Sequence, residues 1–213
     1  MSDQRSADWY KARAGCITAS RFKDVIAKGK SGYLKARSDY LMEIVTERLT
    51  GEPIMKSWGN SGEYGTSMED YARLAYEAET GIMVMESDFI LHPTLPNVGC
   101  SPDGLIGEDG GEETKCPSSS LVHLNTILSD AMPSEHMPQV QGSMACTGRS
   151  WWDFLSYDGR MPDFLRLFIT RIERDNDYIK NLENEIKKFD KEVDQMIEKL
   201  LKHRQPLDYA ESV

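Results

Sequence analysis

Apolar side chains recur every three or four positions in the first 80 residues, which is the spacing of amphipathic helices. This spacing predicts a short helix that carries Phe22, Val25 and Ile26. It also predicts a second helix over residues 38–50 and a third that runs to Thr80. The expected N-caps are Thr18 or Ser20, Ser38, and Thr66 or Ser67, and the expected terminating glycines are Gly29, Gly51 and Gly81.

Beyond residue 81 the pattern changes to short apolar runs that proline and glycine separate, which is typical of β-strands. The runs expected to form strands are residues 82–85, 89–91, 105–106, 113–116, 151–157 and 165–171. A turn over residues 107–111 makes a hairpin of two of them, and a helix is expected around residues 136–146.

The last predicted element is a long helix over about residues 175–203. From Leu182 to Leu200 its apolar residues follow each other in steps of four and three, as in a heptad repeat. Packing against its own domain is the favoured interpretation, because tertiary contact stabilises most helices. A contact between subunits remains the alternative.

The composition indicates one folded domain within the 213 residues. Hydrophobic residues make up 39% and charged residues 28%, which excludes a disordered chain. The four cysteines form no CxxC pair, no apolar run approaches roughly 18 residues, and the N-terminus lacks the features of a secretory signal. We therefore expect a cytoplasmic protein with reduced thiols and no membrane partner.

The net charge of −10 is unevenly distributed. Residues 1–60 hold 11 basic and 7 acidic side chains, so the rest of the chain is strongly acidic. A basic segment on an acidic body can form a local phosphate site, although an ordinary solvated surface explains the charges equally well.

Candidate chemistry is concentrated in residues 100–117. Asp103 precedes the predicted turn, and Glu113 and Lys115 lie two apart on the returning strand, on one face of it. Two carboxylates, with the Thr114 carbonyl as a possible third ligand, suit Mg²⁺ or Mn²⁺, and a lysine beside the metal can hold the attacking water. A surface hairpin with a Glu–Lys ion pair is the alternative.

These residues resemble the core of the PD-(D/E)xK nucleases, and more closely the phage lambda exonuclease branch of YqaJ-type viral recombinases. The resemblance covers about residues 9–200, and its motifs occur in the family's order. The motifs are residues 9–20, 68–73, 101–104, 113–117 and 137–141. Residues 59–64 look like an inserted loop, so the alignment there is open.

The resemblance implies an α/β (α+β) fold with a central mixed β-sheet flanked by helices. It implies one nuclease domain over residues 1–213: a basic helical part (1–60), a catalytic core (61–172) and a C-terminal helix with its tail (173–213). It also implies a homotrimeric ring in the cytoplasm of a bacterial host, encoded by a phage or prophage. Such a ring would repel DNA outside and attract it inside, through residues such as Lys28, Lys30, Lys35 and Arg37.

The activity implied is 5′→3′ degradation of linear double-stranded DNA with two Mg²⁺ ions, which Mn²⁺ can replace, and no ATP. The products are 5′-mononucleotides and a 3′ single-stranded tail for a single-strand annealing protein. The residues implied are, for the metals, Asp103, Glu113, the Thr114 carbonyl and Glu69; for the reacting water, Lys115 and Gln139; and for the 5′-phosphate, Arg13, Ser20 and Ser101.

Three alternatives remain at this point. Glu69 can instead complete a capping box with Thr66. The protein can be an endonuclease of the restriction or junction-resolving type. It can also be a non-catalytic scaffold that binds DNA ends for an annealing protein.

Overall fold

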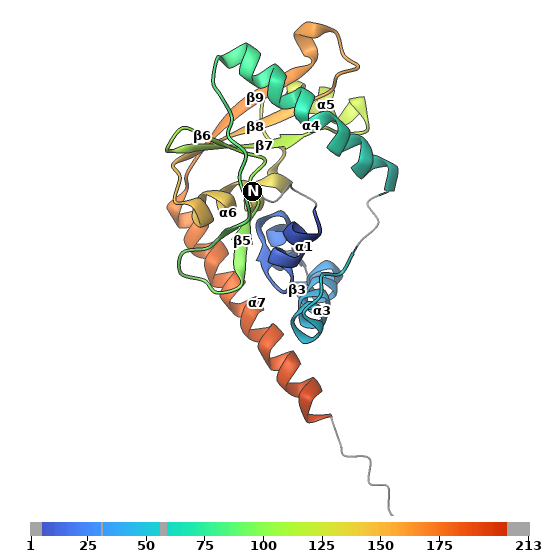
Figure 1. The fold of residues 1–213 in the computed structure, drawn as a ribbon, viewed down its shortest axis with the longest axis vertical. Helices are drawn as coiled ribbons and strands as arrows, with labels where there is room; N and C mark the ends of the chain where they lie inside the picture. Colours follow the sequence, from blue (N-terminus) through green and yellow to red (C-terminus); the bar gives the residue numbers. More distant parts are fainter. Residues whose placement is uncertain (1–5, 31, 56–58, 204–213) are drawn as a thin grey trace, which may run out of the picture.

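A four-stranded mixed sheet, in the upper part of Figure 1, is the largest sheet of the computed structural model, which describes residues 6–30, 32–55 and 59–203. Its strands, in spatial order, are β6 (Gly104–Ile106), β7 (Gly110–Lys115), β8 (Trp151–Tyr157) and β9 (Leu167–Glu173). β7 and β8 are parallel, whereas the two outer pairs are antiparallel. The expected mixed sheet is thus confirmed.

Helices cover both faces of this sheet, and the alternation of side chains along β8 shows why (Figure 1). Trp152 and Phe154 pack on one face against α6 (Met137–Thr147). Leu155 and Tyr157 point to the opposite face, which α4 (Gly59–Thr80) covers. Because both faces are covered, most polar residues of β7 and β8 are buried, among them Glu112, Glu113 and Asp153.

A second core joins the N-terminal segment to the long helix α7 (Asn176–Lys202), beside α6 (Figure 1). Its N-terminal elements are α1 (Ala7–Arg13), β1 (Ile17–Thr18), η1 (Ala19–Arg21), α2 (Phe22–Val25) and α3 (Lys35–Thr50). β1 belongs to a small sheet with β5 (Val98–Cys100) and β4 (Ile90–Leu91). This small sheet therefore connects the N-terminal segment to the hairpin of β6 and β7.

The remaining elements lie at the edges of these two cores. They are the hairpin of β2 (Lys28–Gly29) and β3 (Gly32–Tyr33), helix α5 (Ser120–Ser129), and the 3-10 turns η2 (Ser134–His136) and η3 (Asp163–Leu165). In the part of the chain that the structure describes, no helix meets the length and hydropathy that a membrane span requires.

Several expected boundaries are confirmed, and others are wrong. The strand at residues 151–157 and the long C-terminal helix lie where expected. Helix α3 begins at Lys35, so Ser38 is not its N-cap; the hydroxyl of Ser38 donates to the Lys35 carbonyl instead. Residues 82–85 form only an isolated bridge, from Met85 to Leu105.

The largest correction concerns residues 59–64, which begin α4 rather than form a loop. Thr66 consequently lies inside a helix and cannot be its N-cap. Just after the first predicted helix, β2 and β3 pair as a short antiparallel hairpin.

Candidate active site

The hairpin of β6 and β7 brings Asp103 against the returning strand. β6 and β7 pair in antiparallel register, with Gly104 opposite Glu112. Asp103 therefore lies next to Thr114, whose backbone N–H donates to the Asp103 carboxylate at 2.8 Å. This hydrogen bond fixes the aspartate against the strand that carries Glu113 and Lys115.

Glu113 and Lys115 project from β7 towards the α6 face, as their spacing requires. The Lys115 ammonium forms an ion pair with Glu113 Oε1. Gln139, in the first turns of α6, donates to the same oxygen at 2.6 Å. The other oxygen, Glu113 Oε2, is buried and has no hydrogen-bond partner within the described residues.

Like charges accumulate around this buried carboxylate. Burial, together with the nearby charge of Asp103, raises the pKa of Glu113 to about 8. Burial opposes protonation of Lys115, but Glu113 and Asp103 outweigh it and raise the lysine pKa. Lys115 therefore stays charged at neutral pH, and the site favours a further cation.

Glu69 approaches the same site from α4. The negative charge of Glu69 contributes to the raised pKa of both Glu113 and Lys115, so Glu69 lies close enough to interact with both groups. Because Thr66 and Glu69 both lie within α4, the capping-box interpretation of Glu69 is wrong.

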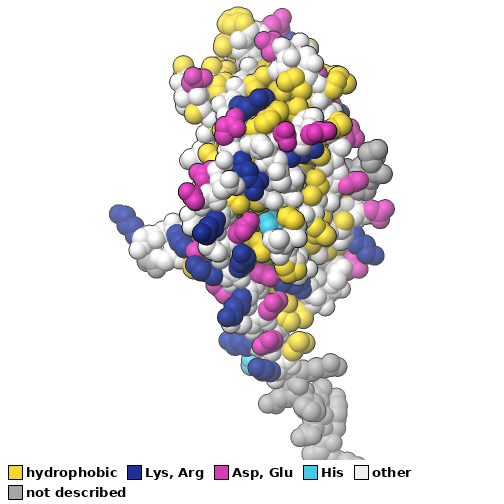
Figure 2. Space-filling view, turned by 90° about the vertical axis from the view of Figure 1, so that its left-hand side faces the viewer, with side chains coloured by type: hydrophobic (Ala, Val, Ile, Leu, Met, Phe, Trp, Pro, Cys, Tyr) yellow, Lys and Arg dark blue, Asp and Glu magenta, His cyan; other side chains and the backbone are white. Residues whose placement is uncertain are grey.

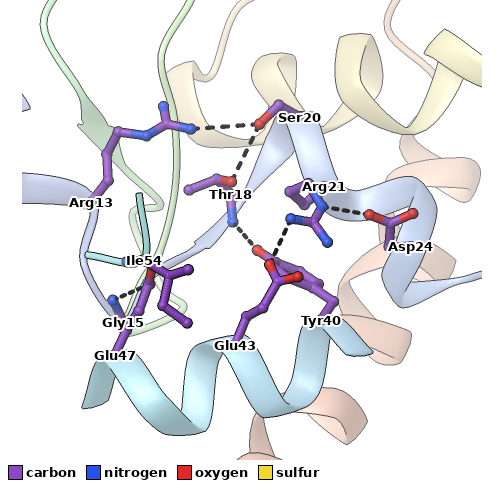
Figure 3. Close-up of polar contacts among 10 residues, drawn as sticks. All are labelled: Arg13, Gly15, Thr18, Ser20, Arg21, Asp24, Tyr40, Glu43, Glu47 and Ile54. Carbon is purple, nitrogen blue, oxygen red and sulfur yellow. Dashed lines mark hydrogen bonds and ion pairs between the residues drawn. The ribbon is translucent and has the colours of Figure 1, made fainter. Parts of the chain in front are cut away.

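A second group of expected residues also comes together, from three separate segments. Arg13, at the end of α1, donates to the Ser101 hydroxyl at 2.6 Å. A second guanidinium nitrogen lies 3.5 Å from the Ser20 hydroxyl, and the contact is drawn in Figure 3. The guanidinium also stacks on the Trp9 ring, 4.0 Å from its centroid, and burial lowers the Arg13 pKa.

The two groups lie near each other because Ser101 is two residues before Asp103. The helix expected to begin near Ser20 is only η1 followed by the four residues of α2. The side chains of Arg13, Ser20 and Ser101 are therefore the donors that the structure offers there.

The cations expected inside a ring are mostly paired within the chain. Arg37 is buried, and its guanidinium contacts Glu192 on α7 at 2.5 Å, so its expected role in attracting DNA is wrong. Lys28 and Lys35 form ion pairs with Glu185 and Asp39 respectively. On the face shown in Figure 2, basic and acidic side chains are mixed.

The oxygen donors of the first group fit a divalent metal ion. Asp103, Glu113 and the Thr114 carbonyl offer hard ligands, and the unpartnered Glu113 Oε2 needs a positive partner. No cluster of three or more His, Cys, Asp or Glu side chains suited to a metal occurs among the described residues. A metal here would accordingly rely on carboxylates, a backbone oxygen and water.

Two features near the site were not foreseen from the sequence. Glu112, beside Glu113, is buried on the α4 face, and burial raises its pKa to about 8. Arg160 binds the segment that follows Lys115. The adjacent glutamates at 112 and 113 are visible in the sequence, whereas nothing in it indicates the Arg160 contacts.

The fold and this combination of a hairpin aspartate with a Glu-x-Lys strand define a nuclease. Residues 8–150 match the model of the YqaJ-like viral recombinase domain. The chain belongs to this family, which confirms the resemblance.

Solved structures agree with this assignment. An alkaline exonuclease from Laribacter hongkongensis is 41% identical, with a TM-score of 0.86 over 93% of this chain and 97% of that one. The same relative was also crystallised in complex with dAMP. A phage-related exonuclease from Haemophilus somnus 129PT shares the fold at 15% identity, with a TM-score of 0.70 over 87% and 96% of the two chains. Comparison with curated proteins gives no match.

Proposed function

We propose that this nuclease is a Mg²⁺-dependent exonuclease that degrades one strand of linear double-stranded DNA in the 5′→3′ direction. Residues 1–213 would act as one nuclease domain. The observation that carries the proposal is the convergence of Asp103, Glu113 and Lys115 beside the group of Arg13, Ser20 and Ser101. At its centre, Glu113 Oε2 is buried and has no hydrogen-bond partner in the described part of the chain.

Each polar residue of the site has a distinct part in this proposal. Asp103, Glu113 and the Thr114 carbonyl would hold one Mg²⁺, and Glu69 would help to hold a second. Bound Mg²⁺ would make water more acidic and neutralise charge that develops on the phosphate oxygens. Lys115 would orient the attacking water, and Gln139 would keep Glu113 in place through its 2.6 Å hydrogen bond.

Polarity would follow from the group of Arg13, Ser20 and Ser101. A guanidinium flanked by two hydroxyls is a receptor for a terminal phosphate, and charge-assisted hydrogen bonds to such a group are strong. Held there, a 5′-phosphate would bring the adjoining phosphodiester towards Asp103. Release of 5′-mononucleotides is consistent with the dAMP complex of the Laribacter relative.

The remaining parts of the proposal concern assembly and biological context. The chain would form a homotrimeric ring around DNA and pass its 3′ tail to a single-strand annealing protein, inside a bacterial host. Its family membership supports this context. The purified protein should then sediment near three times 24.2 kDa, and a concentration-independent monomer with full processivity would reject the ring.

Four initial rates test the reaction: wild type and Arg13→Ala, each on 5′-phosphorylated and 5′-hydroxyl duplex. Wild type should prefer the phosphorylated end at least about tenfold, since charge-assisted hydrogen bonds contribute roughly 1.5–3 kcal/mol each. Arg13→Ala should lose this preference. The variant should cleave hydroxyl ends at nearly the wild-type rate, because removing Arg13 and removing the 5′-phosphate abolish the same interaction.

The contrary outcomes separate the parts of the proposal. Equal wild-type rates on both ends would reject the phosphate pocket alone. Degradation from 3′ ends, or cutting of covalently closed circular duplex, would reject the exonuclease assignment. Binding of ends without Mg²⁺-dependent cleavage would identify a scaffold.

A further inference from the structure

Arg160 lies at a junction of three chain segments next to the site. Its guanidinium donates to the carbonyls of Pro117 and Ser118, at 3.1 and 2.9 Å. These two residues come after Lys115 and Cys116, where the chain leaves β7. The same guanidinium lies over the ring of Tyr64 in α4, 4.7 Å from its centroid.

The buried carboxylate of Asp158 holds Arg160 in this orientation. Asp158 follows the last residue of β8, is fully buried, and accepts from Arg160 Nε at 2.7 Å and Nη2 at 2.9 Å. It also accepts from the Arg160 backbone N–H at 3.0 Å. Burial would raise the pKa of Asp158, but hydrogen bonds from Arg160 and Ser120 hold it well below its usual range.

The segment that Arg160 binds is the one on which α4 rests. A Cβ at Gly65 would lie 3.6 Å from the Cys116 carbonyl oxygen, so the helix backbone approaches this segment closely. Glu69 lies one helical turn beyond Gly65, and Glu113 and Lys115 lie just before Cys116. Arg160 therefore touches both α4, which carries Glu69, and the segment that directly continues β7, which carries Glu113.

We propose that Arg160 is a positioning residue that sets the distance between α4, with Glu69, and the end of β7, with Glu113 and Lys115. It would act through the backbone of Pro117 and Ser118 and the ring of Tyr64, without touching DNA or metal. This inference rests on the proposed metal-dependent function of the same site.

The test uses Arg160→Gln, with Arg166→Gln as the matched control. Both arginines lie in the connection between β8 and β9, and their side chains are 44% and 45% exposed. Arg166 bonds only within that connection, to the Met161 carbonyl and to Asp163, as far as the described contacts show. The two variants thus remove the same charge from neighbouring positions, and only one of them reaches the site.

The first readout is the binding of Mn²⁺ alone, in titration calorimetry without DNA, and the second is the separation of kcat from KM. Loss of a residue that orients ligands typically reduces metal affinity or activity by about 10–100-fold. Arg160→Gln should therefore weaken Mn²⁺ binding at least about tenfold and lower kcat by a similar factor, with KM for DNA ends changed less than about twofold. Arg166→Gln should match wild type in all three.

Arg160→Lys serves as a second variant in case Arg160→Gln does not fold. It keeps the positive charge but lacks the planar guanidinium that donates to two carbonyls, so we expect the same losses of Mn²⁺ affinity and kcat. Mn²⁺ affinity and kcat at wild-type values in a folded Arg160 variant would overturn the inference, as would equal losses in the Arg166 control. A rise in KM alone would instead identify Arg160 as a DNA contact. Wild-type protein without Mn²⁺ binding or cleavage would reject the proposed function itself.

Discussion

The basic N-terminal segment and the carboxylate cluster on β7 differ in how far their charges are paired. In the first region, cations of residues 1–60 pair with acidic residues of α7: Arg37 with Glu192, Arg48 with Asp190, and Lys28 with Glu185. In the second, the charges of Glu113, Asp103 and Glu69 act on a single ammonium, that of Lys115.

This difference separates stabilising charges from functional ones. Pairing across to α7 neutralises much of the net positive charge that made the N-terminal segment look like a DNA-binding surface. The cluster on β7 stays unbalanced, which raises the pKa of Glu113 and leaves its buried Oε2 without a hydrogen-bond partner among the residues that the structure describes. A charge pattern in the sequence therefore indicates a ligand only where the fold leaves it uncompensated.

The largest effect should come from removing Lys115, the cation that pairs with Glu113 in the unbalanced cluster. Lys115→Ala should lower cleavage at least about 10²-fold, because positioned proton-handling groups typically contribute 10²–10⁴-fold. DNA-end binding should change little, since the lysine acts on the transition state. Single-turnover cleavage and end binding by fluorescence anisotropy measure the two quantities, and near-normal turnover would remove Lys115 from the mechanism.

A divalent cation should restore balance to the cluster and stabilise the fold. At a Mg²⁺ concentration of about 100 times its Kd, the gain should be about 2.7 kcal/mol in the free energy of unfolding. Asp103→Asn should lose most of this gain, whereas a Glu198→Gln change on exposed α7 should keep it. Denaturant unfolding with and without Mg²⁺ measures this gain. A gain in Asp103→Asn equal to that of the wild type would contradict the assignment of the metal site.

Substitutions in the paired N-terminal region should change the free energy of unfolding rather than the rate of cleavage. Arg37 is only 4% exposed and also donates to the Val25 carbonyl, so Arg37→Met should cost about 2 kcal/mol by leaving these acceptors without their partner. The specific activity of the folded fraction should stay at the wild-type value. Urea unfolding measures the stability, and active-site titration gives the activity per folded molecule. A lower kcat with unchanged stability would show that Arg37 acts in the reaction rather than in the fold.

The smallest effect should be a pH dependence within the same region. Hydrogen bonds from Lys188 and Tyr33 lower the pKa of Glu185 to about 2. A lowered carboxyl pKa gives stability that is complete above about pH 4.5 and disappears as the pH falls towards 2. Glu185→Gln should thus cost about 1 kcal/mol at pH 6 and almost nothing near pH 2. A constant difference across this range would show that the carboxylate charge is not responsible.

Periodic patterns predicted the elements whose own sequence determines them. The steps of four and three along α7 and the apolar run of β8 gave nearly the observed boundaries, because each buries a face that its sequence marks. The Asp103, Glu113 and Lys115 grouping followed from the spacing of a hairpin strand.

The errors arose where distant residues decide the local structure. Glycines at positions 59, 62 and 65 made the start of α4 look like a loop, yet the helix forms. Arg37 looked like a surface cation because its partner, Glu192, lies 155 residues further along the chain. Arg160 was missed for the same reason, since its carbonyl acceptors come from another segment.

The adjacency of Glu112 and Glu113 on β7 makes the length of the preceding turn critical for evolution of this chain. Successive side chains on a strand point to opposite faces, so inserting or deleting one residue between β6 and β7 would exchange the two glutamates. The strand would still present a carboxylate to each face and keep most of its ladder. Lys115, however, would turn towards α4 in either case, and after an insertion Glu112 would meet Gln139 instead. Length variants at residues 107–109 should therefore be rare among active relatives, even though exposed turns usually tolerate them.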